Sequence, residues 1–172
     1  MNASSPAALI ELGIPTARGE FTARYTAHGL AGISFPRTPD ESRHHPAVTQ
    51  KLNRQITQWH RLTTRALKRA LAGQEPGEWP PLEVVSGTDF QRRVWDALQQ
   101  IPSGTTSSYG ALARQIGRPK AIRAVGGACG ANPLPVLIPC HRVLAANGRL
   151  GGFSGGLEWK RLLLEAEGVE PV

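Results

Sequence analysis

The chain has 172 residues, of which 40% are hydrophobic and four are Trp, which is enough apolar material for a buried core and argues against global disorder. Its formal net charge is +7 and few of the basic residues are Lys, so a polyanionic partner is favoured, nucleic acid first, although a solvated basic surface would give the same count. Two cysteines exclude a disulfide scaffold and indicate a reducing compartment.

No targeting or membrane segment is predicted. Residues 1–17 contain no Lys or Arg and no long apolar run, unlike a secretory signal. No stretch approaches the roughly 20 apolar residues that a membrane helix needs. We therefore expect a cytoplasmic protein without a membrane partner.

The first half of the chain is expected to hold a small sheet and one helix. Residues 9–15, 19–25 and 30–35 have the composition or the alternation of antiparallel strands, with a turn at His28-Gly29. From Pro46 the apolar period becomes helical and continues to Leu71, at Val48, Leu52, Ile56, Trp59, Leu62 and Leu67. Residues 74–87, rich in Pro, Gly and Glu, are interpreted as a connection.

The second half is expected to be mostly helical. Residues 88–101 form the clearest helix, because Thr88 and Gln91 have the spacing of a capping box. A second helix follows Ser108, a third begins at Lys120, and the short Gly-containing break between them is typical of a helix-turn-helix. A last helix covers residues 158–167. The prediction is an α+β protein with a strand-rich N-terminal domain at residues 1–87 and a helical C-terminal domain at residues 88–172.

The third helix contains residues 126–131, which have almost no side chains. Because each glycine costs a helix about 1 kcal/mol relative to alanine, this composition needs a reason. Two reasons are equally open: something large approaches this backbone closely, or another helix packs tightly against it. Arg123 projects from the same helix beside these small residues.

Cys140 is the candidate reactive residue. It lies between a rigid Pro139 and the titratable imidazole of His141, which the guanidinium of Arg142 follows, and such neighbours can hold a thiol as the reactive thiolate. Adjacent residues seldom face each other, so His141 is expected to act through a water or an irregular turn. A third group must then orient the imidazole, and the downstream acidic candidates are Glu158, Glu165, Glu167 and Glu170. Cys129, in contrast, fits a buried small hydrophobe.

These residues resemble the O6-alkylguanine-DNA alkyltransferases, also called methylated-DNA–protein-cysteine methyltransferases. The resemblance covers residues 88–168 and rests on motifs in the family's order, and residues 1–87 resemble the family in outline only. The motifs are Phe90-Gln91-Arg92-Arg93-Val94-Trp95, Ile101-Pro102-Ser103-Gly104, Ser108-Tyr109, Arg123-Ala124-Val125-Gly126, Asn132-Pro133, Ile138-Pro139-Cys140-His141-Arg142-Val143 and the Gly-rich loop at residues 151–156 followed by Leu157.

The resemblance implies a role for each matching position at the reaction centre. Cys140 is the alkyl acceptor, His141 its base through a water, Glu167 the end of the relay, and Asn132 the brace of the turn that holds the thiol. Tyr109 meets the flipped guanine, Ser154 donates to its O6 position, and the carbonyls of Cys140 and Val143 read its amino edge. Phe153 offers an aromatic face in the loop.

The resemblance also implies how DNA is bound. Arg123 fills the space that the flipped base leaves, and the bare helix docks in the minor groove through Ala124, Gly126, Gly127 and Ala128. The implied partner is duplex DNA containing O6-alkylguanine, with O4-alkylthymine as a second substrate. The protein is expected to be a monomer in solution, with clustering on DNA left open. Each molecule acts once, because nothing in the chain suggests a way to cleave a thioether.

No cofactor and no metal are expected. Some members of the family bind a structural zinc through N-terminal Cys and His, but no cysteine precedes Cys129 here, and His44-His45 is interpreted as an exposed loop pair. Two alternatives to a suicidal transferase are a lesion-binding protein without transfer activity and an unrelated cysteine hydrolase. The presence of Cys140 disfavours the first, and the adjacency of Cys140 to His141 disfavours the second.

Overall fold

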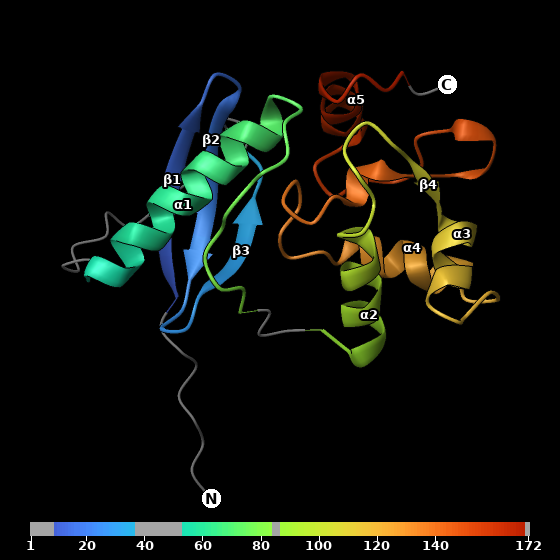
Figure 1. The fold of residues 1–172 in the computed structure, drawn as a ribbon, viewed down its shortest axis with the longest axis horizontal. Coiled ribbons are helices and arrows are strands. Elements are labelled where there is room, and N and C mark those ends of the chain that lie inside the picture. Colours follow the sequence, from blue (N-terminus) through green and yellow to red (C-terminus); the bar gives the residue numbers. More distant parts are fainter. Residues whose placement is uncertain (1–8, 37–52, 84–86, 171–172) are drawn as a thin grey trace, which may run out of the picture.

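The computed structural model describes residues 9–36, 53–83 and 87–170 (Figure 1). A sheet covered by one helix lies beside a cluster of shorter helices (Figure 1). The sheet is antiparallel with the order β1-β2-β3, formed by Ile10–Thr16, Gly19–Tyr25 and Leu30–Ser34. In its register Ile14 pairs with Phe21. The expected strands and their antiparallel pairing are therefore confirmed.

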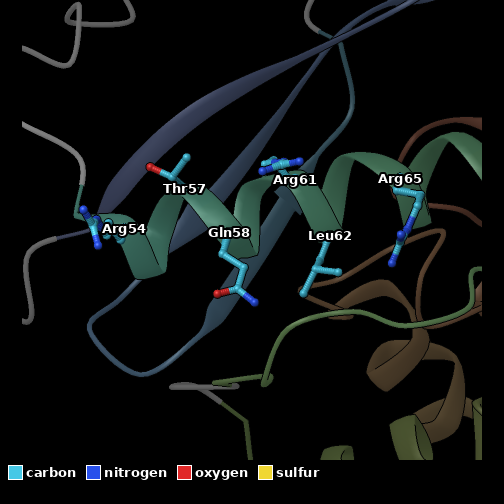
Figure 2. A pocket seen from close by; sticks show the side chains of 6 residues that line it. All are labelled: Arg54, Thr57, Gln58, Arg61, Leu62 and Arg65. Atoms are coloured by element: carbon cyan, nitrogen blue, oxygen red, sulfur yellow. The ribbon is translucent and has the colours of Figure 1, made fainter.

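Helix α1 covers the sheet and spans Arg54–Leu71. Asn53 caps it, because its side-chain oxygen accepts a hydrogen bond from the Ile56 backbone N–H at 2.7 Å. One face is buried at Ile56, Trp59, Thr63, Ala66, Leu67 and Ala70. The opposite face carries polar and basic side chains along the helix (Figure 2). The expected start at Pro46, with Val48 and Leu52, lies outside the described residues.

The C-terminal part begins with α2, Asp89–Leu98, and Thr88 and Gln91 form the expected capping box. Helices α3, Tyr109–Gln115, and α4, Ile122–Gly130, follow, joined by a turn through Gly117. Helix α4 packs against both α2 and α3. The chain closes with α5, Leu157–Ala166.

Two features of this part were not expected from the sequence. Strands β4, Ser107–Ser108, and β5, Val143–Leu144, form a short parallel pair. Between α4 and β5 the chain makes the 3₁₀ turn η2, Cys140–Arg142, and a second turn, η3, Ala146–Gly148, follows β5. Elements this short leave no periodicity in a sequence, so only the tertiary structure defines them.

The two halves share one hydrophobic core. Trp159 of α5 lies against Phe21 and Phe35 of the N-terminal part, with ring centroids 5.3 and 5.2 Å apart, and Phe35 lies 5.5 Å from Phe153. The Ile33 N–H at the edge of β3 donates to the Pro133 carbonyl at 2.8 Å. The sheet therefore supports segments that follow α4, and the predicted boundary between residues 87 and 88 stays a prediction.

Candidate active site

A pocket of about 560 Å³ opens between α3, α4 and the Gly-rich loop. Its volume falls in the range of small-molecule sites. Six of its lining residues were singled out in the sequence, namely Tyr109, Arg123, Gly126, Cys140, Phe153 and Ser154. The other four are Ile122, Cys129, Gly130 and Gly152. Of these, Cys129 was expected to be only a buried small hydrophobe, and Ile122 was not considered as a site residue. Segments separated by more than forty residues thus meet around one thiol.

Asn132 holds the backbone turn that presents Cys140. Its side-chain N–H group donates to the Ile138 carbonyl at 2.8 Å and to Cys140 Sγ at 3.2 Å, and its Oδ1 accepts from the Leu134 N–H at 3.0 Å. Within this turn Val136 has a φ of 76°, a conformation that costs a β-branched residue of order 1–3 kcal/mol. The strained turn is therefore held in place by a buried amide that also contacts the thiol.

Burial keeps the resting thiol protonated. Cys140 is only 3% exposed, and this burial raises its pKa, while the hydrogen bond from Asn132 and the charge of Lys160 act in the opposite direction. The expectation that neighbouring groups hold a thiolate is therefore wrong for this structure, because loss of water outweighs them. A nucleophilic Cys140 needs a base to take its proton.

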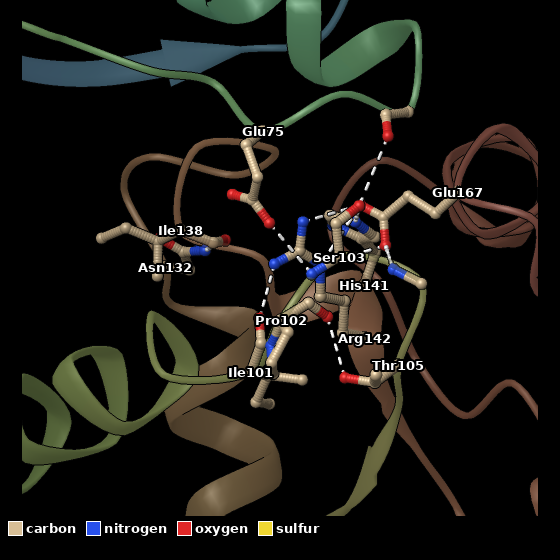
Figure 3. A network of polar contacts seen from close by, with 12 residues as sticks. Glu75, Ile101, Pro102, Ser103, Thr105, Asn132, Ile138, His141, Arg142 and Glu167 are labelled. Atoms are coloured by element: carbon tan, nitrogen blue, oxygen red, sulfur yellow. Dashed lines mark hydrogen bonds and ion pairs between the residues drawn. The ribbon is translucent and has the colours of Figure 1, made fainter.

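A buried ionic network lies behind the thiol, around the carboxylate of Glu167 (Figure 3). His141 Nε2 lies 2.9 Å from Glu167 Oε1. Arg142 donates to both carboxylate oxygens, through Nε at 3.2 and 3.0 Å and through Nη2 at 2.9 Å. The Gly104 N–H adds a donor at 3.3 Å. Of the acidic candidates that the sequence offered, Glu167 is thus the one in contact with His141.

The charges in this network fix the tautomer of His141. Burial alone would raise the pKa of Glu167, but the hydrogen bonds and charges of His141 and Arg142 lower it to about 2. An ionised carboxylate only accepts hydrogen bonds, so His141 Nε2 carries the hydrogen that it donates. Burial also lowers the pKa of His141, more than Glu167 raises it, so the ring is neutral. Its Nδ1, buried and without a partner among the described residues, is then a free base.

Arg142 does not face the thiol. Its guanidinium is buried, donating to Glu167 and, through Nη1, to the Ile101 carbonyl. The expectation that this guanidinium lowers the pKa of Cys140 is therefore wrong, because successive residues of the 3₁₀ turn point in different directions. Arg142 instead neutralises Glu167 and ties η2 to the end of α2.

Lys160 is a buried cation that the sequence analysis missed. Its Nζ donates to the carbonyls of Val143 at 2.6 Å, Leu150 and Gly152, and so joins β5 to the loop that borders the pocket. Lys160, Leu163 and Leu164 are all buried and recur at helical spacing. A cation on the apolar face of an amphipathic helix was the signal that could have identified it.

The substrate-binding candidates differ in their positions. Tyr109 lines the pocket, and burial, with smaller contributions from Cys129 and Cys140, raises its pKa to about 12, so its hydroxyl stays a donor. Gly151, at φ 64°, leaves room for this ring: an added Cβ would lie 3.1 Å from it. Val143 is buried outside the pocket lining, and its carbonyl accepts from Lys160.

The outer face of α4 is bare. Arg123, Ala124 and Gly127 are exposed, and a Cβ added at Gly127 would meet nothing within 4 Å. Tight helix packing therefore does not explain this glycine, which favours the close approach of something outside the chain. Ala128 departs from the expectation of a surface residue: it is 2% exposed, and its carbonyl accepts from Trp95 Nε1 at 2.8 Å.

Comparison with known proteins first defines the class. A family model described as "6-O-methylguanine DNA methyltransferase, DNA binding domain" matches residues 89–169, which include the pocket and the network around Glu167. The chain is 47% identical over 107 residues to the methylated-DNA–protein-cysteine methyltransferase of Methanosarcina acetivorans, covering 60% of this chain and 69% of that protein. It is 59% identical over 81 residues to the Mycobacterium bovis protein of the same name, covering 47% of this chain and 49% of that protein.

Solved structures agree over nearly the whole chain. A crystal structure of Mycobacterium tuberculosis OGT in complex with DNA has a TM-score of 0.69 at 36% identity and covers 92% of both chains. The O6-methylguanine methyltransferase structure from the same organism has a TM-score of 0.71 at 35% identity and covers 96% of both. The chain belongs to the methylated-DNA–protein-cysteine methyltransferase family.

Within the described residues, no group of three or more His, Cys, Asp or Glu side chains is placed to hold a metal ion. His44-His45 lies outside these residues. No helix in the same part of the chain combines the length and the apolar character that a membrane crossing requires.

Replacement of Glu167 by Gln is expected to lower the free energy of unfolding by roughly 3–5 kcal/mol, because the buried Arg142 loses its counter-charge. Glu165→Gln, at an exposed position in the last turn of α5, is the control and should change the free energy of unfolding by less than about 0.5 kcal/mol. Urea denaturation followed by circular dichroism measures both.

The same pair tests the pH dependence. The pKa of Glu167 is depressed from 4.5 to about 2, so its stabilisation is fully present above pH 4.5 and is lost as the pH falls from 4.5 towards 2. The difference between wild type and Glu167→Gln should shrink over that window by on the order of 3 kcal/mol. A difference that does not change with pH would show that the carboxylate is not ionised in the folded protein.

Proposed function

We propose that this chain repairs DNA by moving an alkyl group from O6 of guanine irreversibly onto Cys140. The observation that carries the proposal is the position of Cys140. Its sulfur lies at a pocket large enough for a nucleobase, and the next residue of the same turn is His141, which can accept a proton. Family membership supports the same reaction, because relatives over the matched region are named methylated-DNA–protein-cysteine methyltransferases.

The first step is removal of the thiol proton. His141 Nδ1 takes it through a bridging water, since adjacent side chains on a 3₁₀ turn do not face each other. The ionised Glu167, held at Nε2, stabilises the imidazolium that forms. Because burial raises the pKa of Cys140 and lowers that of His141, the charged pair is unfavourable at rest and forms only as the reaction proceeds.

The thiolate then attacks the alkyl carbon. The S–C bond forms as the C–O6 bond breaks, and the bonding pair leaves with O6. The guanine takes one proton through Tyr109, which regains it from water, and the thiol proton on His141 returns to the solvent, so the protons balance. Tyr109, whose raised pKa keeps its hydroxyl protonated, donates to the base, and Ser154 donates to O6. Phe153 packs along the base from the loop, and the carbonyl of Cys140 accepts from its amino group, whereas the carbonyl of Val143 is held by Lys160.

The target base must leave the helix to reach this pocket, at a cost of a few kcal/mol. We assign this step to the α3–α4 pair, acting as a helix-turn-helix that docks in the minor groove. Arg123, at the pocket rim, enters the base stack, while Ala124, Gly126 and Gly127 let the groove approach the backbone. Ala128 contributes from inside, by fixing α4 to α2 through Trp95.

The product on the protein is a thioether, so each molecule acts once. The reaction needs no cofactor, since the nucleophile and the base both belong to the chain. We place the protein in the cytoplasm, because both cysteines are free thiols, and expect it to act as a monomer, with O4-alkylthymine as a second substrate.

Intact-mass measurement tests the reaction. Incubation with a duplex containing O6-methylguanine should add about 14 Da to the wild-type chain, because a methyl group replaces the hydrogen of a thiol activated for attack. Cys140→Ser should show no gain. Cys129→Ser is the matched control, because Cys129 lines the same pocket, and it should gain the same mass as wild type. Tight DNA binding with no added mass in the wild type would instead indicate a lesion-binding protein.

Gly127→Ala separates protein stability from DNA binding. The added methyl group has open space and improves helix propensity, so the free energy of unfolding should rise by about 0.5–1 kcal/mol. Affinity for duplex DNA should fall, because the methyl group lies between the backbone of α4 and the groove. Thermal denaturation and fluorescence anisotropy report the two effects, and unchanged affinity would remove Gly127 from the interface.

Arg123→Ala should slow transfer from a duplex lesion by at least about tenfold, since a flipped base costs a few kcal/mol that this side chain helps to offset. Transfer from the free base O6-methylguanine should be nearly unchanged. Single-turnover rates on the two substrates make the comparison, with exposed Arg161→Ala as the charge control. Equal losses on both substrates would mean that Arg123 acts in the pocket and not in flipping.

A further inference from the structure

A row of cations follows the outer face of α1, far in sequence from the pocket around Cys140. A shallow hollow of about 680 Å³ on this face is lined by Arg54, Thr57, Gln58, Arg61, Leu62 and Arg65 (Figure 2). Lys68 and Arg69 continue the row towards the end of the helix. We call these five cations the α1 stripe: Arg54, Arg61, Arg65, Lys68 and Arg69.

The α1 stripe lies on one side of the helix. Successive members are seven, four, three and one residues apart, which at 3.6 residues per turn keeps all five within roughly a third of the helix circumference, and all of them are exposed. The residues that α1 buries against the sheet occupy the opposite face. The stripe is therefore an open surface and has no part in the core.

The charge of the stripe is poorly compensated within the chain. In the described residues, the carboxylate in salt-bridge contact with it is Glu78, 3.7 Å from Arg65, and both side chains are more than half exposed. Such a pair contributes little. Helix α1 itself contains no acidic residue, and its first turn carries Arg54, where the helix dipole favours an anion. Arg61 and Arg65 repel each other at a spacing of four residues. A bound polyanion would relieve these unfavourable terms.

The sequence places the excess positive charge in two long stretches without Asp or Glu. One, residues 97–157, contains α3, α4 and the pocket, and the proposed function uses it. The other, residues 42–74, contains α1. The two helices α1 and α4 lie in different halves of the molecule (Figure 1), and no residue lining the α1 hollow also lines the Cys140 pocket. The second basic stretch is thus a separate surface.

We propose that the α1 stripe binds the phosphate backbone of a second DNA segment, apart from the segment that α4 holds. The stripe runs about 21 Å from Arg54 to Lys68 at 1.5 Å per residue, a length that matches about six phosphates along one strand. Four of its five cations are Arg, whose planar guanidinium forms paired hydrogen bonds with phosphate. The surface holds no aromatic ring among its lining residues on which an unpaired base could stack, so duplex backbone is favoured over single strands.

Charge argues for DNA over a second copy of this chain. The protein carries a net charge of +7, so two copies repel each other across a basic face. The inference relies on the proposed function only in taking DNA as the anion at hand. Its consequence is that one molecule can hold two DNA segments at once.

The experiment measures bridging between two unmodified duplexes of about 16 base pairs, one carrying a donor and the other an acceptor fluorophore. The test variant is Arg54→Gln/Arg61→Gln/Arg65→Gln, which removes charge and keeps a good helix former. The control Arg93→Gln/Arg149→Gln/Arg161→Gln removes the same charge at other exposed positions, none of which lines the hollow on α1. A second control, the triple Arg→Lys variant of the stripe, keeps the charge. Circular dichroism checks that every variant is folded.

Wild type, the Lys variant and the distant Gln control should give energy transfer between the duplexes, and the Gln variant of the stripe should lose it. The slope of log affinity against log salt, measured with both duplexes present, should become shallower by about 2 to 3 for that variant, as expected for three lost phosphate contacts. Energy transfer that persists in the stripe variant, or an equal loss in the distant control, overturns the proposal. The proposal is also overturned if the stripe variant loses energy transfer between RNA duplexes but keeps it between DNA duplexes.

Intact-mass transfer from a short lesion duplex is measured on the same proteins. The stripe variant should gain the same mass as wild type, because α1 takes no part in the pocket. If wild type bridges DNA but gains no mass, the proposed reaction fails while the second surface stands. If it gains mass but never bridges, the second surface fails alone.

Discussion

The buried carboxylate of Glu167 is the constraint on which the active-site region depends. It lies just past the end of α5, and its partners come from the turn that carries Cys140 and from the segment after α2. His141 and Arg142 are buried, and the third donor is the backbone N–H of Gly104. The turn with Cys140, the segment after α2 and the end of α5 can therefore make these contacts in only one relative placement. The position of the thiol follows from this charge cluster on one side and from the hydrogen bonds of Asn132 on the other.

The electrostatics of the site keep the thiol of Cys140 protonated at rest and leave its activation to His141. Burial raises the pKa of Cys140 and lowers the pKa of His141, so both are neutral at rest, while Glu167 holds one ring nitrogen of His141 and leaves the other free. A buried neutral thiol is protected from adventitious chemistry, because the thiol form is a poor nucleophile. The reactivity of Cys140 then depends on His141, a base that is already oriented. This arrangement suits a protein whose single nucleophile can react only once.

Local patterns in the sequence predicted the elements well. Alternation located the strands, the capping box at Thr88 located α2, and the motif around Cys140 located the pocket. The predictions that failed concern the direction in which a side chain points and how deeply it is buried. The burial of Lys160 was overlooked, although its place on the apolar face of its helix indicated it. The sequence could not show that Arg142 turns away from the thiol or that Ala128 faces inward, because each depends on a partner more than 30 residues away. Strands β4 and β5 were missed for the same reason: their pairing joins segments that have no periodicity of their own.

The aromatic contacts between Phe35, Phe153 and Trp159 have a consequence for the integrity of the molecule. A protease that cut the chain between the sheet and α2 would leave the thiol, Asn132 and the Glu167 cluster on one fragment. That fragment would lose the rings that back the Gly-rich loop, and the amide of Ile33 would no longer hold Pro133 beside Asn132. The strand-rich half thus supports the Gly-rich loop and the segment around Pro133 by packing against them, although it supplies none of the atoms that react.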